Sequence, residues 1–239
     1  MIRRALVWLA AVLGVALTAS LGLWQLDRAA QKIERQRALD AQALLPALGG
    51  VQLAGAADAS ALDQRRAHLQ GQWIGAATVY LDNRPMNGRA GFYVLTPLQL
   101  ADGNGVILVQ RGWAPRDILD RAKLPPIDTP AGPQTVDGRI TPAPHRMVAL
   151  GEDASGPIRQ NLDLQAFARE QRLALLPMVL VQTGPAAGGL LRDWPAPQTG
   201  ADKHYGYAAQ WFALAALIAG LAFWFQWWLP RKRAAAPHA

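Results

Sequence analysis

Residues 5–26, ALVWLAAVLGVALTASLGLWQL, form a run of 22 residues without a charged side chain. At about 1.5 Å per residue, a helix of this length covers roughly 33 Å, enough for the ~30 Å hydrocarbon core of a bilayer. The stretch therefore predicts a transmembrane helix. A cleaved signal peptide is the alternative, because two arginines before an apolar run also fit that pattern. The run exceeds the usual signal-peptide core of about 7 to 15 residues and has no clear cleavage motif near Ala19, which favours an uncleaved anchor.

A second apolar stretch, YGYAAQWFALAALIAGLAFWFQWWL, occupies residues 205–229. Its position far from the N-terminus excludes a signal peptide, so we expect a second membrane helix over residues 204–229. Aromatic residues gather at its two ends, as expected of rings that prefer the headgroup zone. These residues are Tyr205, Tyr207 and Trp211 at one end and Trp224, Trp227 and Trp228 at the other.

Basic residues flank both spans and predict the orientation. They are Arg3, Arg4, Arg231, Lys232 and Arg233. Because Lys and Arg are enriched in short cytoplasmic segments, we expect the tails, residues 1–4 and 230–239, in the cytoplasm and residues 27–203 outside it. Four basic residues just after the first span run against this rule, which long translocated segments follow only weakly. These four are Arg28, Lys32, Arg35 and Arg37.

The composition excludes several classes of protein. The net charge is +7, but five of the 24 Lys and Arg residues lie in the tails, and 17 Asp and Glu residues nearly balance the rest. A basic nucleic-acid-binding face is therefore a poor interpretation, and we expect no nucleic-acid partner. The absence of cysteine excludes disulfides, thiolate metal sites and iron–sulfur clusters.

The segment between the spans predicts one α+β domain dominated by antiparallel sheet. Five apolar runs bounded by turn residues predict strands. They are Ala77–Leu81, Phe92–Leu98, Val106–Gln110, Thr135–Ile140 and Met178–Gln182. Asn87-Gly88 is a strong hairpin-turn signal between the first two. Further segments predict a charged helix, a Gly- and Ala-rich linker and a short helix capped by its first residue. In that order they are Arg28–Leu45, Gly49–Ala61 and Asp163–Leu173.

Motifs for enzymatic chemistry are missing from the sequence. It has no phosphate-binding loop, zinc-protease histidine pair or nucleophile elbow. The adjacent carboxylates Glu152 and Asp153 fit a solvated loop better than an acid and base pair. The remaining interpretation is a membrane-held outer domain that binds a partner, a cofactor or both. An enzyme would require the fold to bring catalytic residues together from distant parts of the sequence.

His204 is the histidine that stands out, because it directly precedes the second span. On a helix, Tyr207 and Trp211 follow it at i+3 and i+7, so one face can carry an imidazole above two rings. A neutral imidazole at the bilayer edge is a suitable axial ligand for haem iron. On spacing alone, an interfacial residue that only anchors the span is the favoured alternative. Gln25 and Gln210 can hydrogen-bond across the helix pair or remain separate interfacial residues.

Arginines near the ends of the predicted strands offer a second kind of contact. Arg84, Arg89 and Arg111 can pair with haem propionates or with an acidic partner, and ordinary solvated charge is the alternative.

Four motifs, in order along nearly the whole chain, resemble those of the surfeit locus protein 1 family of cytochrome c oxidase assembly factors. They are Gly22-Leu23-Trp24-Gln25-Leu26-Asp27-Arg28; Leu81-Asp82-Asn83-Arg84 followed by Gly88, Gly91 and Thr96-Pro97-Leu98; Val109-Gln110-Arg111-Gly112-Trp113; and His204-Tyr205-Gly206-Tyr207-Ala208 with Gln210-Trp211-Phe212. The residues before the last motif, Gly200–Lys203, lack the paired asparagines common in relatives.

The resemblance implies a non-enzymatic assembly factor that acts when haem a enters the large catalytic subunit of the oxidase. The implied partners are that subunit, the haem a synthesis machinery and membrane lipid. The implied roles are ligation of the haem iron by His204, ring packing by Tyr207 and Trp211, and helix pairing through Trp24 and Gln25. A cofactor-free scaffold for oxidase subunits is the alternative. Because the first span follows Arg4 directly, we expect a bacterial inner membrane and no mitochondrial transit peptide.

Overall fold

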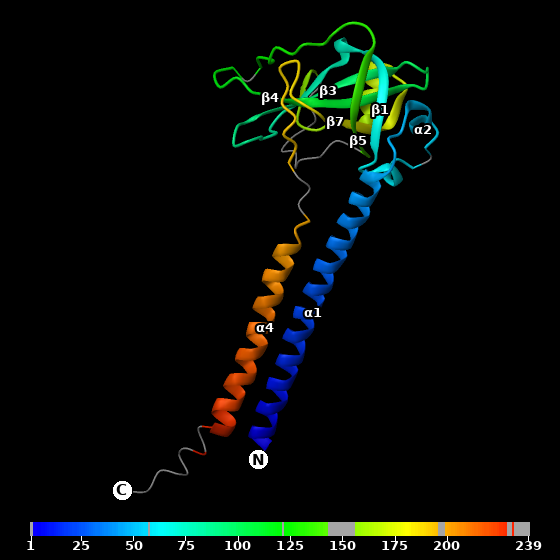
Figure 1. Ribbon diagram of the computed structural model, residues 1–239. Coiled ribbons are helices and arrows are strands. Elements are labelled where there is room, and N and C mark those ends of the chain that lie inside the picture. The colour runs from blue at the N-terminus through cyan, green and yellow to red at the C-terminus, as the bar shows by residue number, and fades with distance from the viewer. Residues whose placement is uncertain are drawn as a thin grey trace. The chain divides into compact units, whose positions relative to one another are not determined.

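The computed structural model describes residues 2–56, 58–120, 122–142, 156–195, 199–228 and 231. The chain forms two compact units (Figure 1). One comprises residues 1–37 and 197–239, and the other comprises residues 38–196. The expectations for Glu152, Asp153 and the basic residues after Arg231 fall outside the described residues.

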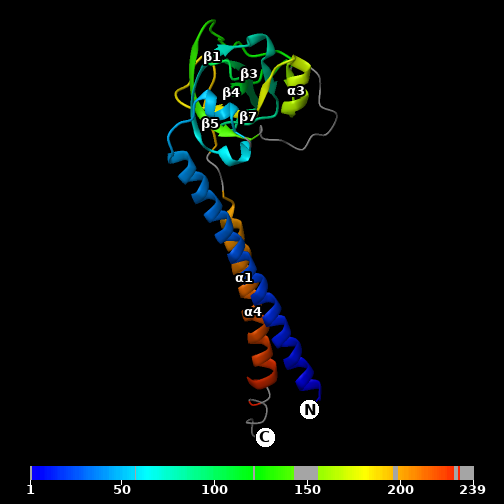
Figure 2. The same ribbon diagram turned by 90° about the vertical axis from the view of Figure 1, so that its right-hand side faces the viewer.

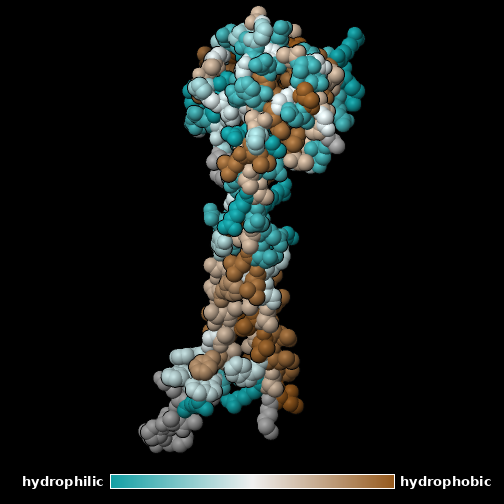
Figure 3. Space-filling view, turned by 45° about the vertical axis from the view of Figure 1, so that its right-hand side comes forward, coloured by the Kyte–Doolittle hydropathy of each residue, from teal (hydrophilic) through white to brown (hydrophobic). Residues whose placement is uncertain are grey.

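The first unit is a pair of long helices. Helix α1 runs from Ile2 to Leu44 without a break, so the predicted span and the predicted charged helix form one element. Helix α4 spans Ala201–Phe223 and continues into the π-helical turn η3, Trp224–Trp228. Only 11% and 17% of the most apolar 18 residues of the two helices are buried, unlike the core helix of a soluble protein. Both are long and apolar enough to cross a membrane, and hydrophobic side chains gather along the pair (Figure 3).

The two helices pack antiparallel through a seam of small residues. Buried and half-buried positions alternate at spacings of three and four, the pattern of a left-handed helix pair. The positions that follow this spacing are Ala11, Val15, Thr18, Gly22, Gln25 and Ala29 on α1 and Ala201, His204, Ala208, Trp211, Ala215, Ile218 and Ala222 on α4, and Gly14, Ala19, Leu21 and Phe212 are half-buried as well. Small side chains let two backbones approach closely where lipid supplies no hydrophobic drive. The seam therefore holds the pair together by contact along most of α4.

The second unit is a small β-barrel. Its strands are β1 (Arg66–Trp73), β2 (Val79–Leu81), β3 (Gly91–Leu100), β4 (Val106–Pro115), β5 (Gln134–Thr141), β6 (Ile158–Arg159) and β7 (Leu175–Gln182). Strands β1, β5, β7, β4 and β3 are hydrogen-bonded in that order, and β3 pairs again with β1 to close the ring. Pairings β4–β7 and β2–β6 are parallel, and the other five are antiparallel. The predicted α+β fold with a mainly antiparallel sheet is confirmed.

Three hydrophobic clusters stabilise the barrel domain, two of them on opposite faces of the sheet. The inner core includes Leu69, Ile107 and Val136, which point inward from alternate strand positions. Helix α3 (Leu164–Gln171) covers the outer face and buries Phe167 there (Figure 2). Asp163 caps this helix as predicted, because its carboxylate accepts a hydrogen bond from the amide of Ala166 at 2.8 Å.

The structure corrects three sequence-based boundaries. Strand β1 was not among the predicted strands, although its residues alternate between exposed and buried. The segment expected to be a linker contains helix α2 (Gly50–Ala54), whose Leu53 is buried, and the 3₁₀ turn η1 (Ala59–Leu62). Strand β4 extends past Gln110 to Pro115. The turn at Asn87 and Gly88 forms as predicted, with both residues at positive φ.

Candidate functional site

The helix pair brings His204 and Gln25 together. The imidazole Nδ1 of His204 lies 2.6 Å from the side-chain Oε1 of Gln25, and both residues are half-buried in the seam. An amide oxygen only accepts hydrogen bonds, so Nδ1 is the donor and carries the proton. In the neutral ring this leaves the lone pair on Nε2, for which no hydrogen bond is recorded among the described residues.

This arrangement is the one that histidine ligands of metals commonly have. A ligating imidazole usually donates its other N–H to an oxygen, which fixes the tautomer and the orientation of the ring. Gln25 supplies that oxygen from the facing helix. The donor set therefore fits an axial ligand for haem iron, with His204 as the candidate ligand that Gln25 would orient.

The other residues expected near His204 take different positions. Trp211 lies in the seam two turns after His204, and Tyr207 is exposed on the same helix. Trp24 is half exposed, with the guanidinium of Arg28 over its ring at 5.5 Å. Gln210 is exposed, so neither Trp24 nor Gln210 contributes to the buried seam.

Gly22 has a specific structural role that the sequence did not reveal. A Cβ atom added there would lie 2.8 Å from the ring of Phe212, which is closer than real Cβ contacts. The ring of Phe212 thus occupies the space that a side chain at position 22 would fill. This contact lies three residues from Gln25 and helps to hold the two helices at the spacing that the His204–Gln25 hydrogen bond needs.

In the barrel, Arg84 is buried and bound to the backbone. Its two terminal nitrogens donate to the carbonyl oxygens of Asp82 and Gln160, each at 2.8 Å. Burial lowers its pKa below the usual value for arginine. Arg84 is 2% exposed, so in this structure it holds the turn after β2 against the segment after β6 rather than facing solvent.

Arg111 is also buried, at the end of the barrel. Its guanidinium lies 4.6 Å from the centre of the Trp73 ring and donates to Thr129 Oγ1 at 2.8 Å and the Asp128 carbonyl at 2.6 Å. Arg89, by contrast, is exposed near the ring of Trp113. The three arginines grouped by sequence therefore do not share one environment.

The motif that contains Arg111 also fastens the barrel together. The indole Nε1 of Trp113 donates to the carbonyl of Arg84 at 2.6 Å, which joins two of the sequence motifs. Gly112 has no room for a side chain, because an added Cβ would lie 2.5 Å from the Cβ of Leu190. The main chain of Leu191 can thus pair with that of Trp113 through two hydrogen bonds of 2.7 and 2.9 Å.

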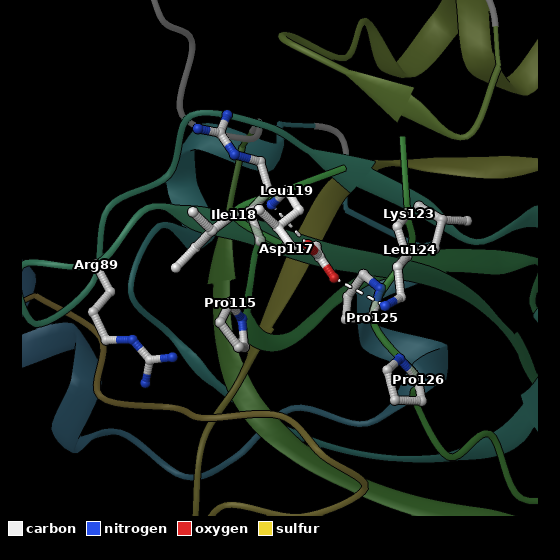
Figure 4. A pocket seen from close by; sticks show the side chains of 10 residues that line it. Arg89, Pro115, Asp117, Ile118, Leu119, Lys123, Leu124, Pro125 and Pro126 are labelled. Atoms are coloured by element: carbon white, nitrogen blue, oxygen red, sulfur yellow. Dashed lines mark hydrogen bonds and ion pairs between the residues drawn. The ribbon is translucent and has the colours of Figure 1, made fainter. Parts of the chain in front are cut away.

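The loop after β4 lines a cavity that the sequence analysis did not predict. Its cavity of about 500 Å³ is lined by Arg89, Arg116, Lys123 and neighbouring apolar residues (Figure 4). Ile118 and Leu119 are 95% and 96% exposed. Asp117 shapes the loop by accepting from the amide of Leu119 and from Lys123 at 2.9 Å each, and these hydrogen bonds lower its pKa to about 2.

No group of three or more His, Asp or Glu side chains within the described part of the chain is placed to hold a metal ion. His68 makes an exposed pair with Asp137 at 2.7 Å. His204 is therefore a candidate ligand as a single imidazole, supported by its hydrogen bond to Gln25 and not by a cluster of ligating residues.

Comparison with known proteins identifies the family. A SURF1-like protein of Monosiga brevicollis is 27% identical over 231 residues, covering 87% of this chain and 82% of that protein. A SURF1-like protein of Dictyostelium discoideum is 37% identical over 68 residues, covering 28% of this chain and only 25% of that protein. The SURF1 family pattern matches residues 12–216, which include α1 from Val12, the barrel and most of α4. The chain therefore belongs to the SURF1 family.

Proposed function

We propose that this chain is a membrane-held assembly factor that binds haem a through His204 while haem enters the large catalytic subunit of cytochrome c oxidase. The family is implicated in cytochrome oxidase assembly, and its members are generally assembly factors rather than enzymes. The observation that carries the haem proposal is the 2.6 Å hydrogen bond between His204 Nδ1 and Gln25 Oε1. This hydrogen bond holds Nδ1 toward Gln25 on α1, so the free lone pair on Nε2 of a neutral ring points away from Gln25.

The proposed site divides its tasks among few residues. His204 supplies the axial nitrogen, Gln25 fixes the ring, and Tyr207 and Trp211 offer aromatic surface on the same helix. Bound haem would supply an iron centre for axial coordination. Arg84 and Arg111 are 2% and 5% exposed, so neither is assigned a propionate contact.

The proposed topology places the barrel in the periplasm of a bacterium and both termini in the cytoplasm. The two apolar helices support a membrane location. The basic residues near the two chain termini, next to both spans, support the orientation. Haem a is lipophilic, so an iron ligand at the start of the second span would let the tail of haem a remain in lipid. The chain would contact the haem a synthesis machinery at the same membrane.

Optical spectroscopy tests the haem proposal. The chain is co-expressed with a haem a source, purified and examined for haem absorbance. We expect His204→Ala to lose the haem signal with its expression intact, and the exposed His68→Ala to keep it as a control. An unchanged spectrum in His204→Ala would remove the ligand assignment.

A cofactor-free scaffold for oxidase subunits is the second candidate, and the exposed Ile118 and Leu119 favour it because such side chains commonly mark protein contacts. The scaffold predicts a colourless protein that recovers oxidase subunits in a pull-down. It also predicts that His204→Ala still supports oxidase assembly, whereas Ile118→Ser with Leu119→Ser does not.

A further inference from the structure

A β-bulge sets the position of Arg111 at the end of the barrel. Gly112 pairs with Val94 and Gln110 pairs with Leu95, which leaves Arg111 as the extra residue of β4. Bulges re-aim a side chain and are common next to functional sites. Here the guanidinium lies against Trp73 and under the segment that contains Asp128, with only 5% of the residue exposed.

A cavity of about 220 Å³ opens beside this guanidinium. Trp73, Arg111, Gln182 and Arg192 contribute to its lining. Two buried polar atoms of these residues have no hydrogen-bond partner among the described residues, the Nε donor of Arg111 and the Oε1 acceptor of Gln182. Buried polar groups are nearly always satisfied, so a ligand with one acceptor and one donor would complete the site.

The charge of this cavity is positive. Arg192 donates from Nε to the carbonyl of Arg111 at 2.8 Å and also bonds the carbonyl of Pro185. Asp128 also lines the cavity, and its exposed carboxylate raises the pKa of Arg111, but no carboxylate of the described residues forms an ion pair with either arginine, so the two guanidinium groups outweigh it. Burial lowers the pKa of Arg111, and the charge of Arg192 lowers it further. An anion bound here would offset the repulsion between the two guanidinium groups.

We propose that this cavity binds a carboxylate that a peptide segment of a partner protein presents, an Asp or Glu side chain together with a neighbouring backbone N–H. The carboxylate accepts from Arg111 Nε and Arg192, and the N–H donates to Gln182 Oε1. A cavity of about 220 Å³ is smaller than the ~300–1,000 Å³ of small-molecule pockets, so it suits one side chain and cannot enclose a porphyrin. A haem propionate carries the same anion but no neighbouring N–H.

The identity of the partner, an oxidase subunit, rests on the proposed function, whereas the binding itself does not. The test therefore uses neither haem a nor oxidase. The full chain is labelled with 5-fluorotryptophan in lipid nanodiscs, and Trp73→Phe assigns the fluorine resonance of Trp73. The probes are two neutral-ended peptides that differ by one charge, Ac-Gly-Glu-Gly-NH₂ and Ac-Gly-Gln-Gly-NH₂.

We expect the Glu peptide to shift the Trp73 resonance saturably and the Gln peptide to leave it in place. Arg111→Gln should weaken binding of the Glu peptide at least about tenfold, because it removes a charged hydrogen-bond donor. Arg192→Gln, at a half-buried position, should weaken this binding by at least about the same factor for the same reason. Arg169→Gln removes the same charge from the exposed face of α3 and should bind as the unaltered chain does.

Equal shifts with both peptides, no shift with either, or undiminished binding in Arg192→Gln would overturn the proposal. Protoporphyrin IX that displaces the Glu peptide, with its dimethyl ester inert, would instead assign the cavity to a haem propionate and overturn the peptide assignment. A chain with His204→Ala should bind the Glu peptide normally, so loss of haem binding and loss of carboxylate binding are separable results.

Discussion

At the scale of single residues, Gln25 decides which nitrogen of His204 is free. Replacing Gln25 with Leu removes the oxygen that accepts from Nδ1, so neither the tautomer nor the orientation of the His204 ring is fixed any longer. We expect haem affinity to fall about 10- to 100-fold, the usual effect of losing such a positioning contact. Haem titration of the purified chain, followed by absorbance, measures this, with Gln210→Leu on the exposed face as the matched control. Equal affinities in the two variants would contradict the role of Gln25.

Glu170 makes a residue-scale contribution to the acid stability of the barrel. Its carboxylate accepts from the buried Arg159 at 2.5 Å, and this hydrogen bond lowers the pKa of Glu170 below 4.5. The pair therefore stabilises the fold fully above about pH 4.5 and loses that contribution as the pH falls through the lowered pKa. Because Glu170 is partly exposed, we expect about 1 kcal/mol at most.

Denaturant unfolding at pH 7 and pH 3 measures this contribution. The unaltered chain should lose more stability on acidification than Glu170→Gln, since the amide cannot titrate. The same loss in both proteins would show that the pair does not contribute to the acid response.

At the scale of elements, the closeness of α1 and α4 depends on Gly22. We expect Gly22→Leu to push the helices apart, because even a Cβ there would lie 2.8 Å from the Phe212 ring. The sequence has no cysteine, so Cys residues placed at Gly14 and Ile218, which are in contact, report the spacing by cross-linking. The cross-linked fraction should fall in Gly22→Leu and stay unchanged in Gly206→Leu, since nothing lies within 4 Å of a Cβ at Gly206. Equal cross-linking in both would contradict this packing.

Strand β4 and the segment around Leu191 depend on Gly112 in the same way. We expect Gly112→Ala to lower the free energy of unfolding of the barrel by about 1–3 kcal/mol, the usual range for overpacking, since its Cβ meets Leu190 and the main chain of Leu191. Gly55→Ala is the control, because its Cβ makes only an ordinary contact at 3.5 Å. Denaturant titration compares the two, and equal midpoints would contradict the close-approach role of Gly112.

Several elements could be predicted from local pattern, and others could not. The strands with long apolar runs and the Asp163 cap were predicted because their signals are local. Strand β1 was missed because its inward residues, Ala67, Leu69 and Gly71, include just one large apolar side chain. The parallel pairing of β4 with β7 joins segments far apart in the sequence, so no local signal could indicate it.

The candidate site shows the same division between local and distant information. The position of His204 before an apolar stretch is visible in the sequence, and so is the polar Gln25 near the end of the other span. Their hydrogen bond depends on the register of two helices, as does the exposure of Gln210. The burial of Arg84 depends on the carbonyl of Gln160, a distant residue that no spacing rule supplies.

At the scale of the whole molecule, the proposed topology predicts which side of the membrane the barrel occupies. Leu119 is 96% exposed, so Leu119→Cys places a single accessible thiol on the barrel of a chain that has no other. In spheroplasts, a membrane-impermeant maleimide should label this thiol without lysis. Labelling only after lysis would place the barrel in the cytoplasm and contradict the topology.

Chemical rescue tests whether the imidazole of His204 ligates the haem iron. His204→Gly leaves a space where the ring stood and keeps Gln25 in place to accept from an added imidazole. The measurement is the haem absorbance of this variant before and after addition of free imidazole. We predict that haem absorbance is lost in His204→Gly and restored by imidazole, with no such response in His68→Gly. A variant that retains its haem spectrum without imidazole would contradict ligation by His204.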